Sequence, residues 1–325
     1  MFYLIHRNQT LYKNISHSQN DFEDKNLALI LTFHHHHYRL DGIDSSMLPA
    51  NSKLFAIEDT NVDVEFSFTF HFVDVLPEAG NSSKGMPWEI TYQRPNIMIW
   101  NCKGLERRRL SFNGQSHAYA VYEESSNTHA DIWYLTRLKN ELNIDTLFIS
   151  TLSLERHLAP HGAYILHCAY LNHQGEAILF SGPSGAGKST HANLWEQMIP
   201  ETHLVNGDRC LICREDDGSF QAFGWPICGS SGICRVENHR IRAIVFIEQT
   251  PENQVIAERP ARLFARLFSQ ITVNHWDATA TAAAADWTAK LMQHVSVMVY
   301  GCNMAPDAPY PLLTHLNQIA NAPCH

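Results

Sequence analysis

A phosphate-binding loop pattern constrains this chain more than any other feature. Residues 182–189 read GPSGAGKS and fit G-x-x-x-x-G-K-[ST] at every fixed position. The apolar run 177–181 before it has the length of a strand, and residues 190–199 carry apolar side chains at helical spacing. In a strand, loop and helix of this kind, backbone N–H groups and a helix N-terminus surround phosphate oxygens. We therefore predict a nucleotide-binding loop rather than an ordinary glycine turn.

The residue types in the loop suit a triphosphate with its metal ion. The glycines lack a Cβ, so the backbone can turn sharply and approach the phosphates. Lys188 would reach the β- and γ-phosphates, and the Ser189 hydroxyl would ligate Mg²⁺. The predicted cofactors are therefore ATP and Mg²⁺. The predicted nucleotide-binding residues are Gly182, Pro183, Ser184, Gly185, Ala186, Gly187, Lys188, Ser189 and Thr190.

Charge and hydropathy exclude several classes of partner. The 24 basic and 33 acidic residues give a net charge of −9, which argues against a nucleic-acid binder and against an anionic membrane surface. No apolar run approaches the roughly 20 residues of a membrane span. The start, residues 1–8, has too short an apolar stretch for a signal peptide, so we expect a cytoplasmic protein.

Two clusters of potential metal ligands occur in the sequence, one of cysteines and one of histidines. The eight cysteines should be thiols in a reducing compartment, and Cys210 and Cys213 lie in a predicted strand, where they would point to opposite faces. The spacing of Cys228 and Cys234 does not match a zinc ribbon, so we disfavour zinc there. For the histidine run 34–37 we favour a solvated strand or loop, with metal binding as the alternative.

The first part of the chain predicts a small β-rich domain over residues 1–140. Residues 62–68 alternate as a half-buried strand does, and residues 97–100 and 117–122 are further strand candidates, with a turn-rich segment at 77–85. The arginine cluster 107–109 is interpreted as a solvated face, with an anionic partner as the alternative.

The pattern changes after residue 140 and predicts a second domain over 141–325. We expect a helix over 151–158, a buried strand over 162–171 and a tight turn at 172–175 leading to the strand 177–181. This places an antiparallel pair beside the loop, where most nucleotide-binding sheets have a parallel crossover. We expect this domain to fold and bind nucleotide without the β-rich half.

A carboxylate for a second Mg²⁺ contact follows the loop. Asp208 lies within the apolar run 203–212, about twenty residues past Lys188, where such a ligand is needed. The alternative is a turn aspartate, since Asn206-Gly207 is a hairpin signal; we favour the metal role.

Further elements complete the predicted domain. Residues 223–232 form a glycine- and serine-rich loop that we interpret as a lid. A central strand is expected over 241–248, ending at Glu248. Amphipathic helices at 258–271 and 280–294 and a last strand at 295–300 follow it.

From residue 166 to about 300 the chain resembles the catalytic domain of HPr kinase/phosphorylase and its relatives, which share a fold with phosphoenolpyruvate carboxykinases. The resemblance covers about half the chain and implies an α/β (α+β) fold: a P-loop domain with a mixed sheet, preceded by the smaller β-rich domain. It is carried by residues 166–169 (LHCA), 175–189, 206–209 (NGDR), 244–249 (IVFIEQ) and 273–277 (VNHWD).

The resemblance implies roles for individual residues. The loop glycines and Lys188 would hold the nucleotide phosphates, and Ser189 and Asp208 would hold Mg²⁺. His167 falls where HPr kinases keep an active-site histidine, with a buried core histidine as the alternative, so the implied catalytic set is Lys188, Asp208 and His167. One departure is Gly207, because HPr kinases have adjacent aspartates there and the first acts as base.

The function predicted from these residues is ATP-dependent transfer of the γ-phosphoryl group to a hydroxyl, such as a serine of a peptide or small protein. The alternative from a different class is a nucleotide-binding regulatory module without transfer activity. Carboxykinase-like metabolism is disfavoured, because we find no basic cluster that would grip a dicarboxylate. The sequence assigns no oligomeric state.

Overall fold

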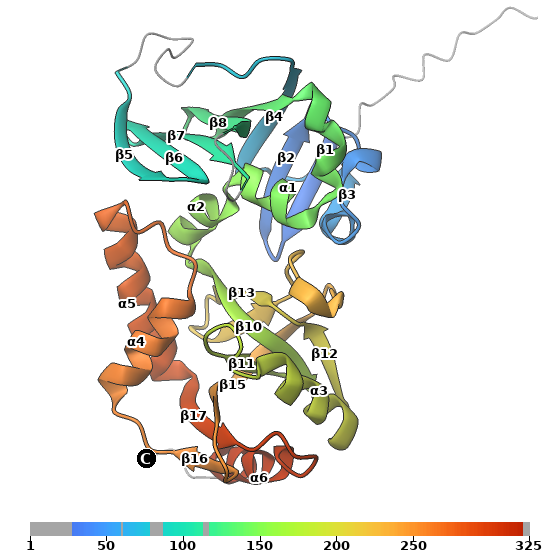
Figure 1. Cartoon of the computed structure of the whole chain (residues 1–325), viewed down its shortest axis with the longest axis vertical. Coiled ribbons are helices and arrows are strands. Elements are labelled where there is room, and N and C mark those ends of the chain that lie inside the picture. The colour runs from blue at the N-terminus through green and yellow to red at the C-terminus, as the bar shows by residue number, and fades with distance from the viewer. Residues whose placement is uncertain (1–27, 60, 79–86, 113–116, 321–325) are drawn as a thin grey trace, which may run out of the picture.

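Two β-sheets follow one another along the long axis of the molecule (Figure 1). The computed structural model describes residues 28–59, 61–78, 87–112 and 117–320. The segment 1–8 and most of the turn-rich segment 77–85 lie outside these residues. None of the helices within the described ranges combines the length and the apolar character needed to span a membrane.

The first sheet has nine strands in the order β3-β1-β2-β4-β9-β8-β7-β6-β5. Its centre contains parallel pairs, because β4 runs parallel to both β2 and β9. In β4 the residues Phe66, Phe68 and Phe70 are buried and alternate with more exposed residues, as a half-buried strand requires. The expected strand at 62–68 therefore begins at Phe66, whereas the strands expected at 97–100 and 117–122 coincide with β6 and β8. The bounds are β1 (Ala28–Phe33), β2 (His36–Asp41), β3 (Ala56–Asp59), β4 (Phe66–Val73), β5 (Glu89–Arg94), β6 (Ile97–Cys102), β7 (Leu105–Ser111), β8 (Ala118–Ser126) and β9 (His129–Leu135).

Short helices connect the two sheets: η3 (Thr136–Asn143), α1 (Asp145–Leu152), α2 (Leu154–Leu158) and η4 (Ala159–His161). The helix expected over 151–158 is interrupted at Ser153, which has a left-handed backbone with φ of 53°. Phe148 of α1 stacks on Phe70 of β4 with ring centroids 6.3 Å apart. Helix α1 thus packs on the first sheet although it follows residue 141.

The second sheet has eight strands and contains a small barrel. Its main path is β11-β10-β13-β14-β15-β17-β16, and β11 also pairs with β15, which closes β10, β11, β13, β14 and β15 into a ring. The antiparallel β10–β11 pair is confirmed, and β11 runs parallel to β15 on its other side, so the sheet is mixed. The bounds are β10 (Ala163–His173), β11 (Glu176–Ser181), β12 (Thr202–Asn206), β13 (Arg209–Arg214), β14 (Phe220–Phe223), β15 (Asn238–Gln249), β16 (Gln254–Ile256) and β17 (Ser296–Cys302).

Helices cover this sheet through two separate apolar clusters. Alternate strand residues such as Leu179 pack in one cluster with Leu267 of α4 (Pro260–Gln270) and Leu291 of α5 (Ala278–His294). Their sequence neighbours, such as Phe180, pack in another with Trp195 of α3 (Lys188–Met198) and Leu316 of α6 (Pro309–Ala320). The expected helices at 258–271 and 280–294 and strands at 241–248 and 295–300 correspond to α4, α5, β15 and β17.

A third apolar cluster crosses from one sheet to the other. Trp225, which follows β14, is fully buried, and its ring centroid lies 4.8 Å from that of Phe33 in β1. Phe55 of η2 (Ser52–Phe55) belongs to the same cluster. Because the two halves share this core, separate folding of residues 145–325 would expose Trp225 to solvent. The domain boundary near 140 stays a prediction.

Buried ion pairs lie near the same junction. Arg107 and Arg108 are only 1% and 3% exposed, so the interpretation of 107–109 as a solvated face is wrong for these two residues. Arg107 pairs with Glu123 at 3.2 Å, and Arg108 pairs with Glu106 at 2.8 Å. Their burial is compensated by these carboxylates, which lie on the same strand and on neighbouring β8.

Candidate functional site

The glycine loop lies where β11 ends and α3 begins. Gly187, which precedes α3, has φ of 100°, so its backbone conformation favours glycine; a Cβ there would lie 2.2 Å from Cε at the flexible end of the Met304 side chain. Among the residues that the structure describes, no side chain caps the N-terminus of α3. The first N–H groups of the helix are therefore available to an anion at the loop.

Lys188 lies on the inner side of this loop. It is 7% exposed, and its Nζ donates hydrogen bonds to the carbonyl oxygens of Gly182 at 2.9 Å and Pro183 at 3.1 Å. Burial lowers the pKa of Lys188, whereas the nearby Asp208 carboxylate raises it. The loop thus holds a desolvated cation at its centre.

The remaining predicted loop residues are more accessible. Ser189 and Thr190 are exposed in the first turn of α3, and within the described residues neither hydroxyl forms a hydrogen bond. Pro183 and Ser184 are exposed at the tip of the loop. This part of the loop therefore faces solvent, from which a nucleotide would enter.

Asp208 lies at a break between two strands that both pair with β10. Strands β12 and β13 run antiparallel to consecutive parts of β10, so Gly207 and Asp208 interrupt one line of pairing and do not form a hairpin. Asn206 Oδ1 accepts the N–H groups of Asp208 and Arg209, both at 2.9 Å, and the carbonyl of Asp208 accepts the N–H of Cys168 at 3.0 Å. The Asn206-Gly207 hairpin signal is therefore wrong, whereas the choice between a metal ligand and a plain turn aspartate stays a prediction.

His167 is held between two polar side chains. Its Nε2 lies 3.6 Å from Asp208 Oδ1, and its Nδ1 lies 3.0 Å from Gln270 Oε1. The ring is half-buried, so His167 is not a fully buried core histidine. Burial, and then the charge of Lys188, lower the pKa of His167, so the imidazole is neutral at pH 7. With Gln270 Oε1 as the acceptor, Nδ1 carries the proton and Nε2 is the basic nitrogen.

The three predicted catalytic residues are thus neighbours. His167 and Asp208 are close enough for an ion-pair contact, and Lys188 shifts the pKa of His167 while its own pKa responds to Asp208. The group combines an ammonium, a neutral imidazole and a carboxylate beside a glycine loop. These are the functional groups needed to bind phosphate, accept a proton and ligate a divalent cation.

Packing explains why residue 207 is glycine. A Cβ at position 207 would lie 2.3 Å from Ser231 Oγ and 2.4 Å from Ser231 Cβ, so no second carboxylate fits beside Asp208. Ser231 belongs to η5 (Gly229–Ser231), in the loop 223–232 that we interpret as a lid. A Cβ on Gly229 would lie 3.0 Å from the Cβ of Asp208, so this loop packs directly against the carboxylate-bearing residue. Its movement stays a prediction.

Two residues beside the loop were not assigned from the sequence. Gln249 ends β15, the parallel neighbour of β11, and its Nε2 donates to Gly185 O at 3.4 Å. Met304 lies against Gly187 after β17. The position of Gln249 at the end of a parallel strand is a detectable signal, whereas nothing in the sequence marks Met304. Glu248 pairs instead with Arg266, at 2.7 Å.

The cysteines at 210, 213, 228 and 234 lie in or beside the core. Cys210 and Cys213 lie in β13 and both are buried, and Cys210 Sγ lies 3.4 Å from Cys168 Sγ. Within the described residues, the groups with metal-ligand geometry consist of histidines and carboxylates.

Comparison with known proteins identifies the family. A sequence profile described as "SynChlorMet cassette protein ScmC" matches residues 134–315. The chain belongs to the ScmC family. The matched part of this ScmC protein runs from the end of β9 into α6 and includes the glycine loop, His167 and Asp208.

A solved structure is also similar to part of the ScmC chain. The Hpr(Ser) kinase/phosphatase from Coxiella burnetii aligns with 48% of this chain and 88% of its own, at 14% sequence identity and a TM-score of 0.27. No curated protein sequence matches the chain.

Proposed function

We propose that this ScmC protein is an ATP- and Mg²⁺-dependent phosphotransferase that moves the γ-phosphoryl group to a hydroxyl of a peptide or small protein. The observation that carries the proposal is the grouping of Lys188, His167 and Asp208 at the glycine loop. A phosphate site formed by chance would not need the carboxylate and the neutral imidazole beside the lysine.

The loop residues fit a nucleotide triphosphate. Lys188 now donates to two neutral carbonyl oxygens, and phosphate oxygens are stronger acceptors for an ammonium group. The N-terminus of α3 adds its partial positive charge on the same side. Lys188 and α3 would thus hold the phosphates, and Gln249 would fix the loop through Gly185.

Ser189 and Asp208 would hold the metal ion, and both offer the oxygen ligands that Mg²⁺ requires. When bound, Mg²⁺ neutralises charge on the transferring group. The backbone N–H groups of Asp208 and Arg209 donate to Asn206 Oδ1. These hydrogen bonds fix the backbone that carries the Asp208 carboxylate. Such preorganisation lowers the cost of charge stabilisation during transfer.

His167 is the residue that we assign as base. In the transfer, the acceptor oxygen bonds to the γ-phosphorus, the bond from phosphorus to the ADP oxygen breaks, and the hydroxyl proton moves to His167 Nε2. Gly207 cannot supply the carboxylate that does this in HPr kinases, and the neutral ring of His167 faces Asp208.

The packing at Gly207 also favours a second candidate, a nucleotide-binding regulatory module. Without the second carboxylate, the site retains what it needs to bind ATP but loses the base used in HPr kinases. The two candidates differ in one measurable property, which is transfer of phosphate to an acceptor.

The test combines binding and transfer on the full-length chain. ATP affinity is measured by calorimetry for wild type, Lys188→Ala and the exposed control Lys290→Ala, and we expect at least a tenfold loss for Lys188→Ala alone. Mass spectrometry of serine-containing peptides after incubation with ATP and Mg²⁺ then detects phosphate. We expect transfer by wild type, weaker Mg²⁺-dependent transfer by Asp208→Asn and none by His167→Ala.

Two results would contradict the proposal in different ways. Equal ATP affinity of wild type and Lys188→Ala would show that the glycine loop is not a nucleotide-binding site. Tight ATP binding with no transfer to any peptide, protein or metabolite tested would favour the regulatory module.

A further inference from the structure

The histidine run forms an unusual turn that connects two neighbouring strands of the first sheet, β1 and β2. Phe33 pairs with His36, so His34 and His35 alone connect β1 and β2. His34 has φ of 59°, in the left-handed region, and His35 does not have a positive φ. A two-residue turn of this kind favours glycine at its first position. The chain therefore keeps an imidazole where the backbone favours a residue without a side chain.

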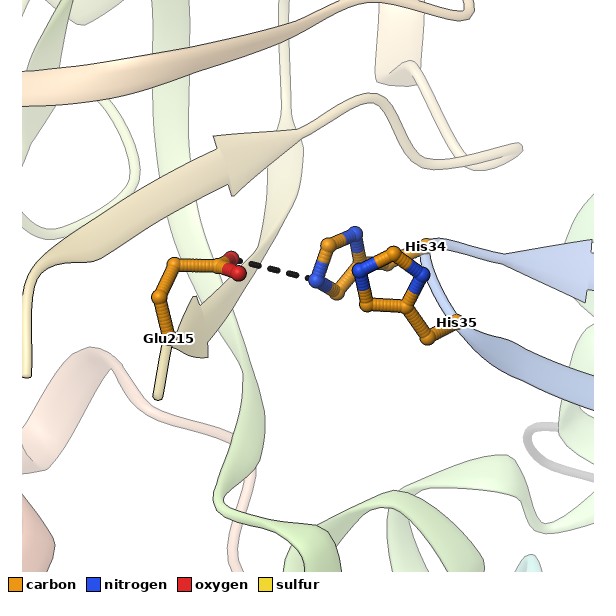
Figure 2. A group of neighbouring side chains, drawn as sticks. All are labelled: His34, His35 and Glu215. Carbon is orange, nitrogen blue, oxygen red and sulfur yellow. Dashed lines mark ion pairs between the residues drawn. The ribbon is translucent and has the colours of Figure 1, made fainter. Parts of the chain in front are cut away.

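This imidazole lies between groups from both halves of the molecule. The His34 ring centroid is 3.6 Å from that of His35 and 4.0 Å from that of Phe223, in β14 of the second sheet. His34 Nε2 lies 3.1 Å from Glu215 Oε1, and Glu215 directly follows β13 (Figure 2). One nitrogen from each histidine and a carboxylate oxygen of Glu215 all lie within 4.8 Å of one another.

The Glu215 carboxylate lacks the partner that a buried oxygen needs. Oε1 is shielded from solvent and forms no hydrogen bond within the described residues, because its contact with His34 lacks hydrogen-bond geometry. An imidazole nitrogen and a shielded carboxylate oxygen that lie 3.1 Å apart without a hydrogen bond are held together favourably when a cation lies between them.

The contact has the dimensions of a metal coordination edge. Nitrogen and oxygen ligands lie about 2.0–2.1 Å from Zn²⁺, so two ligands of a tetrahedral ion are separated by about 3.3 Å. The His34–Glu215 separation of 3.1 Å is close to this value. Imidazole nitrogens with one carboxylate oxygen form a ligand set that suits zinc and neighbouring transition metals better than Mg²⁺.

We propose that His34, His35 and Glu215 bind a divalent transition-metal ion of the zinc class, with water as the fourth ligand. The ion would connect the β1–β2 turn of the first sheet to the end of β13 in the second. This site is separate from the proposed Mg²⁺ ligands Ser189 and Asp208, and it does not depend on phosphotransfer.

A neighbouring group explains why the site is assigned to these residues. His36, Glu65 and His161 also have their ligand atoms within 4.8 Å of one another. There, however, His36 Nδ1 lies 2.9 Å and 3.1 Å from the two Glu65 oxygens with hydrogen-bond geometry. That histidine and carboxylate satisfy each other without an ion.

The test uses metal-free full-length protein without nucleotide. Co²⁺ absorption and Zn²⁺ calorimetry are measured for wild type, His34→Gly, His35→Ala and Glu215→Gln, with His161→Ala as the matched control. His34→Gly suits the turn and His35 is exposed, so both variants should fold. We expect the tetrahedral Co²⁺ bands in wild type and His161→Ala, and at least a tenfold weaker Zn²⁺ affinity in the other three.

Thermal unfolding supplies a second readout that separates loss of metal from loss of fold. Zn²⁺ should raise the midpoint of wild type and leave that of His34→Gly unchanged, while the two proteins unfold at similar temperatures in EDTA. Zn²⁺ affinity unchanged in His34→Gly and Glu215→Gln would overturn the proposal. So would loss of binding in His161→Ala alone.

Discussion

Replacing Gly207 with alanine should lower the free energy of unfolding by about 2 kcal/mol through contact with one neighbour, Ser231. The backbone at 207 does not have a positive φ, so alanine does not meet the penalty of a left-handed conformation there. The new Cβ would instead lie 2.3 Å from Ser231 Oγ, well inside contact distance.

The magnitude follows from the two ways in which the clash can be relieved. Ser231 Oγ donates to Cys228 O at 2.7 Å and accepts from Ile233 N at 3.2 Å. If Ser231 moves, both hydrogen bonds are lost, at roughly 1 kcal/mol each. If it stays, overpacking costs about 1–3 kcal/mol. Either route leads to a loss of about 2 kcal/mol.

A double-mutant cycle measured by urea denaturation tests this reasoning. Ser231→Gly removes both clashing atoms, so Gly207→Ala in that background should cost less than about 0.5 kcal/mol, a coupling of roughly 1.5 kcal/mol. An equal cost of Gly207→Ala in both backgrounds would show that Ser231 is not what keeps residue 207 a glycine. The denaturant slope should remain the same in all four proteins.

Three further predictions concern the junction and one buried histidine, His191. Trp276→Phe removes the indole N–H that donates to buried Glu106 Oε1 at 2.6 Å, and should lower the free energy of unfolding by about 1–3 kcal/mol in urea denaturation; no loss would refute the role of this bond. Contrary to the expectation from the sequence, residues 145–325 expressed alone should be insoluble or unfolded by circular dichroism, since Trp225 loses Phe33 and Phe55; a soluble fragment that binds ATP would refute this and support the sequence-based expectation. Burial lowers the pKa of His191 from 6.5 to about 4, so between these values the unfolded chain binds a proton that the folded chain does not, and stability falls as pH falls. His191→Gln should make the fall between pH 6 and 5 shallower by up to about 1.4 kcal/mol, and an unchanged slope would count against it.

Local patterns were enough to predict the elements around the loop. The strand before it, the antiparallel β10–β11 pair and helix α3 each depend on residues that are close in sequence. The position of Asp208 could be predicted for the same reason, because its distance from Lys188 along the chain reflects one helix and one strand. The roles of these residues and the bound ATP and Mg²⁺ stay predictions.

Long-range contacts explain what the sequence could not predict. Closure of the barrel depends on pairing of β11 with β15, which have no shared sequence signal. Burial of Arg107 depends on Glu123 on the neighbouring strand. The arginine cluster alone therefore could not predict that this side chain is buried. The break at Ser153 has a left-handed conformation without a glycine, and therefore a helix was expected to continue through it.

The contacts around the loop 223–232 assign a physical task to the β-rich half. Trp225 in this loop packs on Phe33 of β1, and Asn51 Nδ2 of the same half donates to Pro226 O at 3.0 Å. Further along, the loop contacts the metal-ligand candidate directly, because Gly229 lies against Asp208.

The same loop is also tied to the strand that leads to Asp208. Asn206, whose Oδ1 holds the backbone of Asp208, donates through its Nδ2 to Trp225 O at 2.6 Å. The loop therefore contacts Asp208 directly through Gly229 and indirectly through Asn206, and the first sheet holds the loop at Trp225. An element that moved as a free lid would have to break these contacts. We therefore expect the β-rich half to support the position of the loop that packs against Asp208.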